Sequence, residues 1–244
     1  MSPRRRALAR RLGSVATGAL LLHGCATHVV PPPEGERGSI AVRPGRAGAV
    51  IAAPHGGSDP RTGELAAELA RRTGFGLVVA NGVAAQDAGA AAGGARYHVN
   101  RPPQGVPGRA PAGEARRVDE AYEQRVREAA RGRLAFYAEI HGDRRSDAVG
   151  PIEIATAGVQ AADARRLRVL LELVRDAHLR AHPGAPRLDA RVAPADPAVF
   201  GILPPPGRAL HIALPRAARI EWRRVYTAIL ADFLAQAAAL PPIR

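Results

Sequence analysis

The feature that most constrains the fold is a regular alternation between short apolar segments and longer amphipathic ones. Apolar segments with the length of buried strands lie at 48–52, 75–83, 134–143, 150–158, 188–193 and 209–215. Segments whose apolar residues recur every three or four positions, which predict helices, lie at 62–74, 114–133, 160–182 and 219–240. Alternation of strands and helices is typical of α/β proteins. We therefore predict a single α/β domain with a mixed, mostly parallel sheet and helices on both faces.

The residues between these segments are typical of caps and loops. Thr62 stands where it can cap the first helix, and Gly74 stands where it can end it. The stretch 84–95 is of low complexity, and 96–113 is rich in proline and glycine. We expect both stretches to be loops, and loops of such length are often functional.

The first 39 residues predict export and attachment to a membrane. An arginine-rich start is followed by the short apolar segment SVATGALLL and then by Cys25, the single cysteine. That segment is too short to cross a bilayer, so residues 1–24 favour a signal peptide. The motif LHGC is similar to a lipobox and predicts lipidation at Cys25; the alternative is an ordinary secretory signal. We expect 25–39 to be a proline-rich tether and 40–244 to be the folded domain, exported to a bacterial cell envelope and facing the periplasm.

The formal charge of +13 raises nucleic acid or an anionic membrane as a partner. All 35 basic residues are arginine, however, and alanine, glycine and proline are abundant. That joint bias is typical of a GC-rich genome, and no arginine stripe with interleaved aromatic residues stands out. We therefore expect no nucleic-acid partner.

Two histidines lie at the carboxyl ends of predicted strands. His55 follows the first strand in the stretch APHGGSD, and His141 closes the stretch AFYAEIH. Ligands of open α/β sheets bind outside the carboxyl ends of the strands, and imidazole is a common zinc ligand. Asp59 would complete a set of three ligands and leave one position open for water. Exposed loop histidines without a metal are the alternative.

Three motifs in this order resemble a known family. The stretches PHGGSDPRTGELA, HVNRP and AEIHGD look like those of the zinc carboxypeptidase-like hydrolases, especially the N-formylglutamate amidohydrolase and poly-γ-glutamate hydrolase branches. The resemblance implies a zinc carboxypeptidase or phosphorylase/hydrolase-like fold. It also implies that His55, Asp59 and His141 bind Zn²⁺, while Asn100 and Arg101 hold a substrate carboxylate. An arginine fork is suited to that task because it meets a carboxylate in two parallel hydrogen bonds.

Glu139 lies two residues before His141. Positions i and i+2 of a strand share a face, so Glu139 is expected to orient a ligand from behind.

The general base departs from the family pattern. The resemblance places an acid late in the chain, where this sequence has Ala213. Glu153 and Glu221 are the candidate replacements, Glu153 being preferred, and His211 is a further acid–base candidate.

We therefore expect a zinc-dependent hydrolase that cleaves an amide or peptide bond in a small acidic substrate. The alternative is a non-catalytic envelope lipoprotein that binds an anionic ligand or metal in the same pocket, and the departure at Ala213 favours it. A third reading, an arginine-driven adaptor for phospholipid or nucleic acid, predicts binding that falls steeply with salt.

Overall fold

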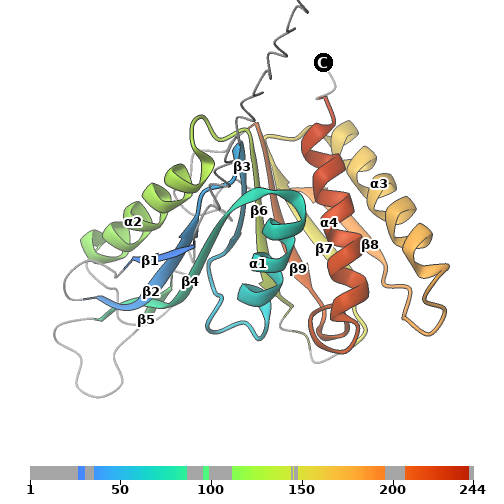
Figure 1. Cartoon of the computed structure of the whole chain (residues 1–244), viewed down its shortest axis with the longest axis horizontal. Coiled ribbons are helices and arrows are strands. Elements are labelled where there is room, and N and C mark those ends of the chain that lie inside the picture. Colours follow the sequence, from blue (N-terminus) through green and yellow to red (C-terminus); the bar gives the residue numbers. More distant parts are fainter. Residues whose placement is uncertain are drawn as a thin grey trace, which may run out of the picture.

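The computed structural model describes residues 27–30, 36–86, 96–98, 112–143, 145, 148–195 and 207–241. Within these residues nine strands form one sheet (Figure 1). The strands are β1 (His28–Val30), β2 (Glu36–Arg43), β3 (Arg46–Ala53), β4 (Phe75–Gln86), β5 (Arg96–His98), β6 (Phe136–Gly142), β7 (Ile152–Ala157), β8 (Ala190–Pro194) and β9 (Arg208–Leu214). The helices are α1 (Thr62–Thr73), α2 (Ala112–Ala130), α3 (Ala161–Leu179), the π-helix η2 (Ala217–Glu221) and α4 (Arg223–Ala239).

The strand order in the sheet is β1-β2-β4-β3-β6-β9-β7-β8, and β5 pairs with β4. The centre is parallel: β3 pairs with β4 and with β6, and β6 pairs with β9. Antiparallel pairs join β1 to β2, β2 to β4, β5 to β4 and β7 to β9, while β7 and β8 are parallel. The expected mixed α/β sheet is confirmed, with its parallel part concentrated at the centre.

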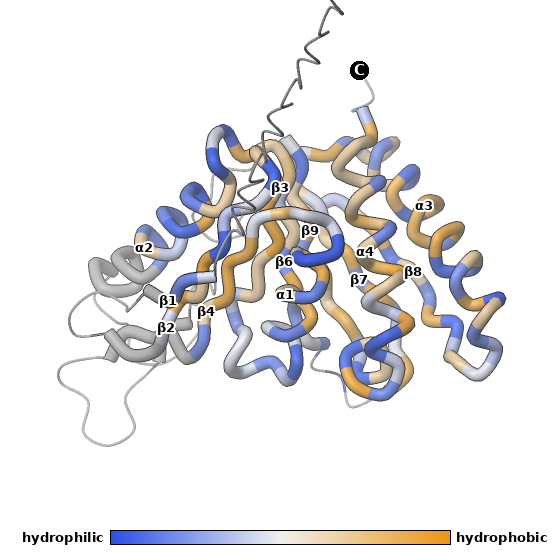
Figure 2. Tube along the Cα trace, viewed as in Figure 1, coloured by the Kyte–Doolittle hydropathy of each residue, from blue (hydrophilic) through white to orange (hydrophobic). Residues whose placement is uncertain are grey.

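Helices cover both faces of the sheet, as predicted, and each face has its own apolar core. Helices α1, α3 and α4 pack on one face, where Leu65, Leu171 and Ile229 are among the buried residues. Helix α2 packs on the other face through Tyr122 and Val126. In Figure 2 strand β4 is coloured mainly apolar where it crosses the sheet, whereas the helices alternate between apolar and polar colours. Burial of these apolar faces is the main stabilising contribution to the fold.

Helix α1 begins differently from the sequence prediction. Its N-cap is Arg61, which has a left-handed backbone (φ 68°) and makes no side-chain capping bond. The Thr62 hydroxyl donates instead to the carbonyl of Asp59, at 2.9 Å. Gly74 ends the helix in the left-handed conformation that glycine adopts without a steric cost, as expected. The hydroxyl of Thr62 therefore fastens the loop before α1 and does not cap the helix.

The edge strands are the main departure from the sequence prediction. Strand β1 and the first part of β2 lie in the segment 25–39, so the sheet begins before residue 40. Strand β4 continues to Gln86, and β5 lies in a stretch that was expected to be loop. No helix within the described part of the chain is long and apolar enough to cross a bilayer.

Candidate metal centre

The structure brings His55, Asp59 and His141 together, with one ligand atom from each within 4.8 Å of the others. His141 lies on β6, and His55 and Asp59 lie on the turn that follows β3. Strands β3 and β6 are parallel neighbours, so their carboxyl ends meet at the same edge of the sheet. Both histidines are buried and Asp59 is half-buried.

The imidazole rings of His55 and His141 approach each other through their Nδ1 atoms. Nδ1 of His55 and Nδ1 of His141 lie 3.3 Å apart, and the rings are at 68° to each other. The other nitrogen of His141, Nε2, lies 3.0 Å from Oε2 of Glu139. An ionised carboxylate only accepts, so Nε2 of His141 carries a hydrogen; in the neutral ring Nδ1 is then the nitrogen with the lone pair, and it faces His55.

Asp59 is fastened to the end of β6. Its Oδ2 accepts a hydrogen bond from the backbone amide of Gly142, at 3.0 Å, and lies 3.8 Å from Nδ1 of His55. Partial burial opposes ionisation, but the close contact with His55, the hydrogen bond from Gly142 and the charge that both histidines carry when protonated lower the pKa of Asp59 to about 2. The carboxylate is therefore ionised at neutral pH and points a negative charge at the two rings.

The spacing of these atoms fits a tetrahedral metal ion. Two imidazole nitrogens bound to one zinc ion at about 2.0–2.1 Å lie about 3.3–3.4 Å apart. The two Nδ1 atoms already lie 3.3 Å apart, and the Asp59 oxygen is 3.8 Å from the nearer one. Two nitrogens and one carboxylate oxygen are a donor set that zinc takes in catalytic sites. The residues present therefore fit Zn²⁺.

A buried chain of side chains supports His141 from behind. Oε1 of Glu139 accepts the hydroxyl of Tyr137 at 2.7 Å, and that hydroxyl lies 3.2 Å from the hydroxyl of Tyr122 on α2. Burial alone would raise the pKa of Glu139, but the hydrogen bond and charge of His141 lower it. Burial and the charge of Glu139 raise the pKa of both tyrosines, which stay protonated. The orientation of His141 is thus determined by residues that reach back to α2.

A second set, Glu139, His141 and His211, also has three ligand atoms within 4.8 Å of one another. His211 stacks on His141, with ring centroids 3.9 Å apart and planes at 14°. Burial and the neighbouring His141 lower the pKa of His211 to about 4, so its ring is neutral at pH 7. Glu139 is fully buried and already bonded to His141 and Tyr137. The set that contains Asp59 is better suited to a metal ion that a substrate must reach, because the carboxylate of Asp59 is partly exposed on a loop, whereas that of Glu139 is fully buried and already bonded.

Arg219 is a residue of this centre that the sequence did not single out. It lies on η2, is 6% exposed, and donates to the carbonyl of Pro60 at 2.7 Å and to that of Leu214 at 3.0 Å. Its guanidinium also closes over Gly142, where an added Cβ would lie 3.1 Å from Cζ. Arg219 therefore joins the loop that carries Asp59 to the ends of β6 and β9.

Gly56 of the first loop allows the loop to pack against the sheet. A Cβ on Gly56 would lie 2.5 Å from Cγ1 of Val79 and 3.3 Å from the carbonyl of Ala80, both on β4. The close approach that the glycine permits is therefore to strand β4. The same loop ends at Arg61, whose left-handed backbone costs about 1–2 kcal/mol. Such strain persists only where the surroundings hold it.

The structure leaves the two candidate bases outside the three-ligand set. Glu153 on β7 pairs with Arg145 at 3.0 Å and with Arg191 at 3.5 Å. Its register partner on β9 is Ala213, which is the register partner of His141 on β6, so Glu153 and His141 share a face of the sheet. Glu221 ends η2 and pairs with Arg216 at 2.8 Å. Asn100, Arg101 and Cys25 lie outside the described residues.

Comparison with known proteins finds similarity in structure only. No protein-family model matches the chain, and no curated protein sequence matches it. Solved structures of the class that the sequence motifs resemble are similar to this chain, at low sequence identity and low TM-score. A bacteriophage poly-γ-glutamate hydrolase is 14% identical with a TM-score of 0.46, over 82% of this chain and 87% of that one.

A metallo-carboxypeptidase from Burkholderia cenocepacia is 13% identical with a TM-score of 0.42, over 87% of this chain and 63% of that one. A succinylglutamate desuccinalase from Vibrio parahaemolyticus is 12% identical with a TM-score of 0.39, over 91% of this chain and 70% of that one. At these values the assignment of function depends on the chemistry of the site.

Proposed function

We propose that the protein is a zinc-dependent hydrolase that cleaves an amide or peptide bond in a small acidic substrate. The observation that carries the proposal is the 3.3 Å spacing of the Nδ1 atoms of His55 and His141, with ionised Asp59 beside them. Such a spacing between two nitrogens requires either a shared proton or a cation, and the carboxylate favours the cation. The acidic nature of the substrate comes from the sequence resemblance, which assigns Asn100 and Arg101 to a substrate carboxylate.

The residues of the centre would bind the ion, orient its ligands and hold the loop of Asp59. His55, Asp59 and His141 supply the three ligand atoms, and Glu139 keeps the Nδ1 lone pair of His141 directed at the ion. Bound zinc supplies Lewis acidity that polarises a carbonyl and makes a water molecule more acidic. The amide of Gly142 and the guanidinium of Arg219 keep the loop of Asp59 in place.

Glu153 is the proposed general base. Side chains directly opposite in an antiparallel pair have Cβ atoms about 4.5–5.5 Å apart, and the residue opposite Glu153 is Ala213. The methyl group of Ala213 leaves room for the Glu153 carboxylate to turn across β9 toward His141. There it takes one proton from the attacking water and gives it to the leaving nitrogen. A carbon–oxygen bond forms, the carbon–nitrogen bond breaks, and a carboxylic acid and an amine result.

The place of the reaction is a further part of the proposal. A signal peptide over 1–24 and lipidation at Cys25 would put the domain on a cell-envelope membrane, facing the periplasm. An acidic peptide of the cell wall or a polyglutamate is then the substrate class of choice.

The test is hydrolysis of N-formylglutamate and of short γ-glutamyl peptides by the purified protein, after chelation and after reloading with zinc. N-formylmethionine, which lacks the second carboxylate, is the matched control substrate. We expect zinc-dependent turnover of the acidic substrates that disappears in His141→Ala and falls at least about 100-fold in Glu153→Gln. Zinc-loaded, folded protein that hydrolyses none of them would refute the proposal and favour a binding protein.

A further inference from the structure

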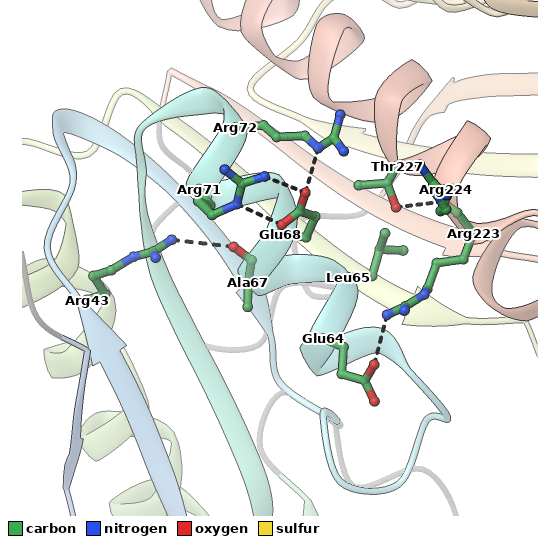
Figure 3. A pocket seen from close by; sticks show the side chains of 10 residues that line it. All are labelled: Arg43, Glu64, Leu65, Ala67, Glu68, Arg71, Arg72, Arg223, Arg224 and Thr227. Atoms are coloured by element: carbon green, nitrogen blue, oxygen red, sulfur yellow. Dashed lines mark hydrogen bonds and ion pairs between the residues drawn. The ribbon is translucent and has the colours of Figure 1, made fainter.

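Arginine residues make up half of the lining of a concave surface beside helix α1. It has a volume of about 570 Å³ and shares no residue with the metal centre. Its lining comes from the end of β2, from the outer side of α1 and from the start of α4 (Figure 3). These residues, which we call the arginine groove, are Arg43, Glu64, Leu65, Ala67, Glu68, Arg71, Arg72, Arg223, Arg224 and Thr227.

The groove has an excess of positive charge, because it contains five arginines and two glutamates. Both carboxylates are already engaged. Glu68 accepts two hydrogen bonds from Arg71, at 2.8 and 2.7 Å, and one from Arg72 at 2.7 Å. Glu64 accepts from Arg223 at 2.8 Å and from Arg61, just outside the groove, at 2.7 Å. Three of the five arginines thus share these two carboxylates, and the groove keeps three more positive than negative charges.

Two guanidinium groups are placed to meet a ligand. Among the described residues, no carboxylate lies within ion-pair distance of Arg43 or Arg224. Arg43 donates to the carbonyl of Ala67 over a long 3.4 Å. Figure 3 shows Arg43 on one side of α1 and Arg224 on the other. A ligand that meets both must carry more than one anionic group.

We propose that the arginine groove is a second binding site, for a linear chain that carries several carboxylates. The guanidinium fork pairs with carboxylate in two parallel hydrogen bonds, as Arg71 does with Glu68. Ala67, which is partly exposed, offers a small apolar surface for the aliphatic part of such a chain. The volume falls in the range of about 300–1,000 Å³ that is usual for ligand sites.

The segment of α1 that lines the groove is as long as a chain of a few residues. Glu64 to Arg72 covers about 12 Å of helix, at about 1.5 Å per residue. An extended chain covers that distance with about four residues. Identification of the ligand as polycarboxylate rests on the proposed function, because an acidic polymer bound both here and at the metal centre gains effective concentration. The excess of positive charge does not depend on that function.

The binding test uses metal-free protein and a fluorescent oligoglutamate, with anisotropy measured at rising salt. We expect binding that weakens with salt and falls about tenfold in the double variant Arg43→Gln/Arg224→Gln. The matched control is Arg165→Gln/Arg168→Gln on α3, which removes the same charge and should bind like the parent protein. Equal thermal melting of the variants excludes a folding defect.

Two further probes separate the sources of anionic groups. Tripolyphosphate should compete weakly with oligoglutamate, and vesicles of phosphatidylglycerol should bind the groove variant and the parent protein equally. A groove variant that loses vesicle binding while it keeps oligoglutamate would overturn the proposal in favour of a membrane surface. A groove variant that binds oligoglutamate like the parent protein would also overturn it.

The proposal fails separately from the proposed function. With zinc bound, the groove variant should cleave a long polyglutamate more slowly and N-formylglutamate at the parental rate. If the protein binds oligoglutamate through Arg43 and Arg224 but hydrolyses nothing, the groove proposal is supported and the hydrolase proposal is refuted. Zinc-dependent hydrolysis without groove-dependent binding would support the hydrolase proposal and refute the groove proposal.

Discussion

Replacement of Arg219 by alanine tests how the centre is held together. The side chain is 6% exposed and makes two charge-assisted hydrogen bonds, to the carbonyls of Pro60 and Leu214. Each such bond contributes about 1.5–3 kcal/mol, and the cost of burying the guanidinium offsets part of that sum. Burial also lowers the pKa of Arg219, which agrees with such a cost. We expect a net loss of about 2–4 kcal/mol in the free energy of unfolding.

The same replacement should loosen the loop of Asp59 and so weaken metal binding about 10- to 100-fold. The assays are urea unfolding and competition for zinc with a chromophoric chelator. Arg219→Lys, which can reach one of the two carbonyls, should lie between alanine and the parent protein.

Arg216→Ala is the matched control for Arg219→Ala. Arg216 lies at the start of the same π-helical turn, its side chain is 63% exposed, and it pairs with Glu221 at 2.8 Å. An exposed pair contributes at most about 1 kcal/mol, so this variant should keep parental stability and zinc affinity. Parental zinc affinity in a folded Arg219→Ala protein would refute the idea that Arg219 positions the Asp59 loop.

Two further predictions concern the metal centre, and a third concerns the ion pairs of Asp176 at the end of α3. Glu139→Gln should weaken zinc binding about 10- to 100-fold, because the amide no longer forces hydrogen onto Nε2 of His141; chelator competition measures the change, and unaltered affinity would contradict it. Zinc at about 100 times its dissociation constant should raise the free energy of unfolding by about 2.7 kcal/mol, seen as a rise in Tm of about 5–10 °C that His55→Ala removes. The pKa of Asp176 is lowered to about 2 by Arg187 and Arg175, so its ion pairs stabilise the fold above about pH 4 and that contribution disappears as the pH falls toward 2. Asp176→Asn should therefore cost about 1 kcal/mol at pH 7, after allowance for the 40% exposure of the side chain, and little at pH 2; an equal loss at both pH values in urea unfolding would contradict this.

The elements with strong periodicity could be predicted from the sequence. Strands β3, β6 and β9 are short apolar segments that both faces of the sheet bury, and α1 and α4 have apolar stripes that pack on them. The edge strands β1 and β2 could not be predicted, because prolines separate them and edge strands bury less apolar surface. The π-helical turn η2 lies within a continuous helical pattern and gives no signal in periodicity.

The histidines of the site could be predicted because His55 follows an apolar strand and His141 lies at the end of another. The hydrogen bonds that orient His141 were partly predictable, because Tyr137, Glu139 and His141 alternate along one strand and so share a face. The role of Arg219 could not be predicted, because nothing in its local sequence distinguishes it among 35 arginines. Its role arises from three segments, around residues 60, 142 and 214, that meet only in the folded chain.

The central claim is that His55, Asp59 and His141 hold one zinc ion, and elemental analysis of the purified protein tests it most directly. The samples are the parent protein, His55→Ala, His141→Ala and His182→Ala, the last removing an exposed histidine after α3 as a matched control. We predict about one zinc ion per chain in the parent and in His182→Ala, and a loss of zinc in the other two. Folded parent protein that takes up no zinc, or equal zinc in all four samples, would contradict the account.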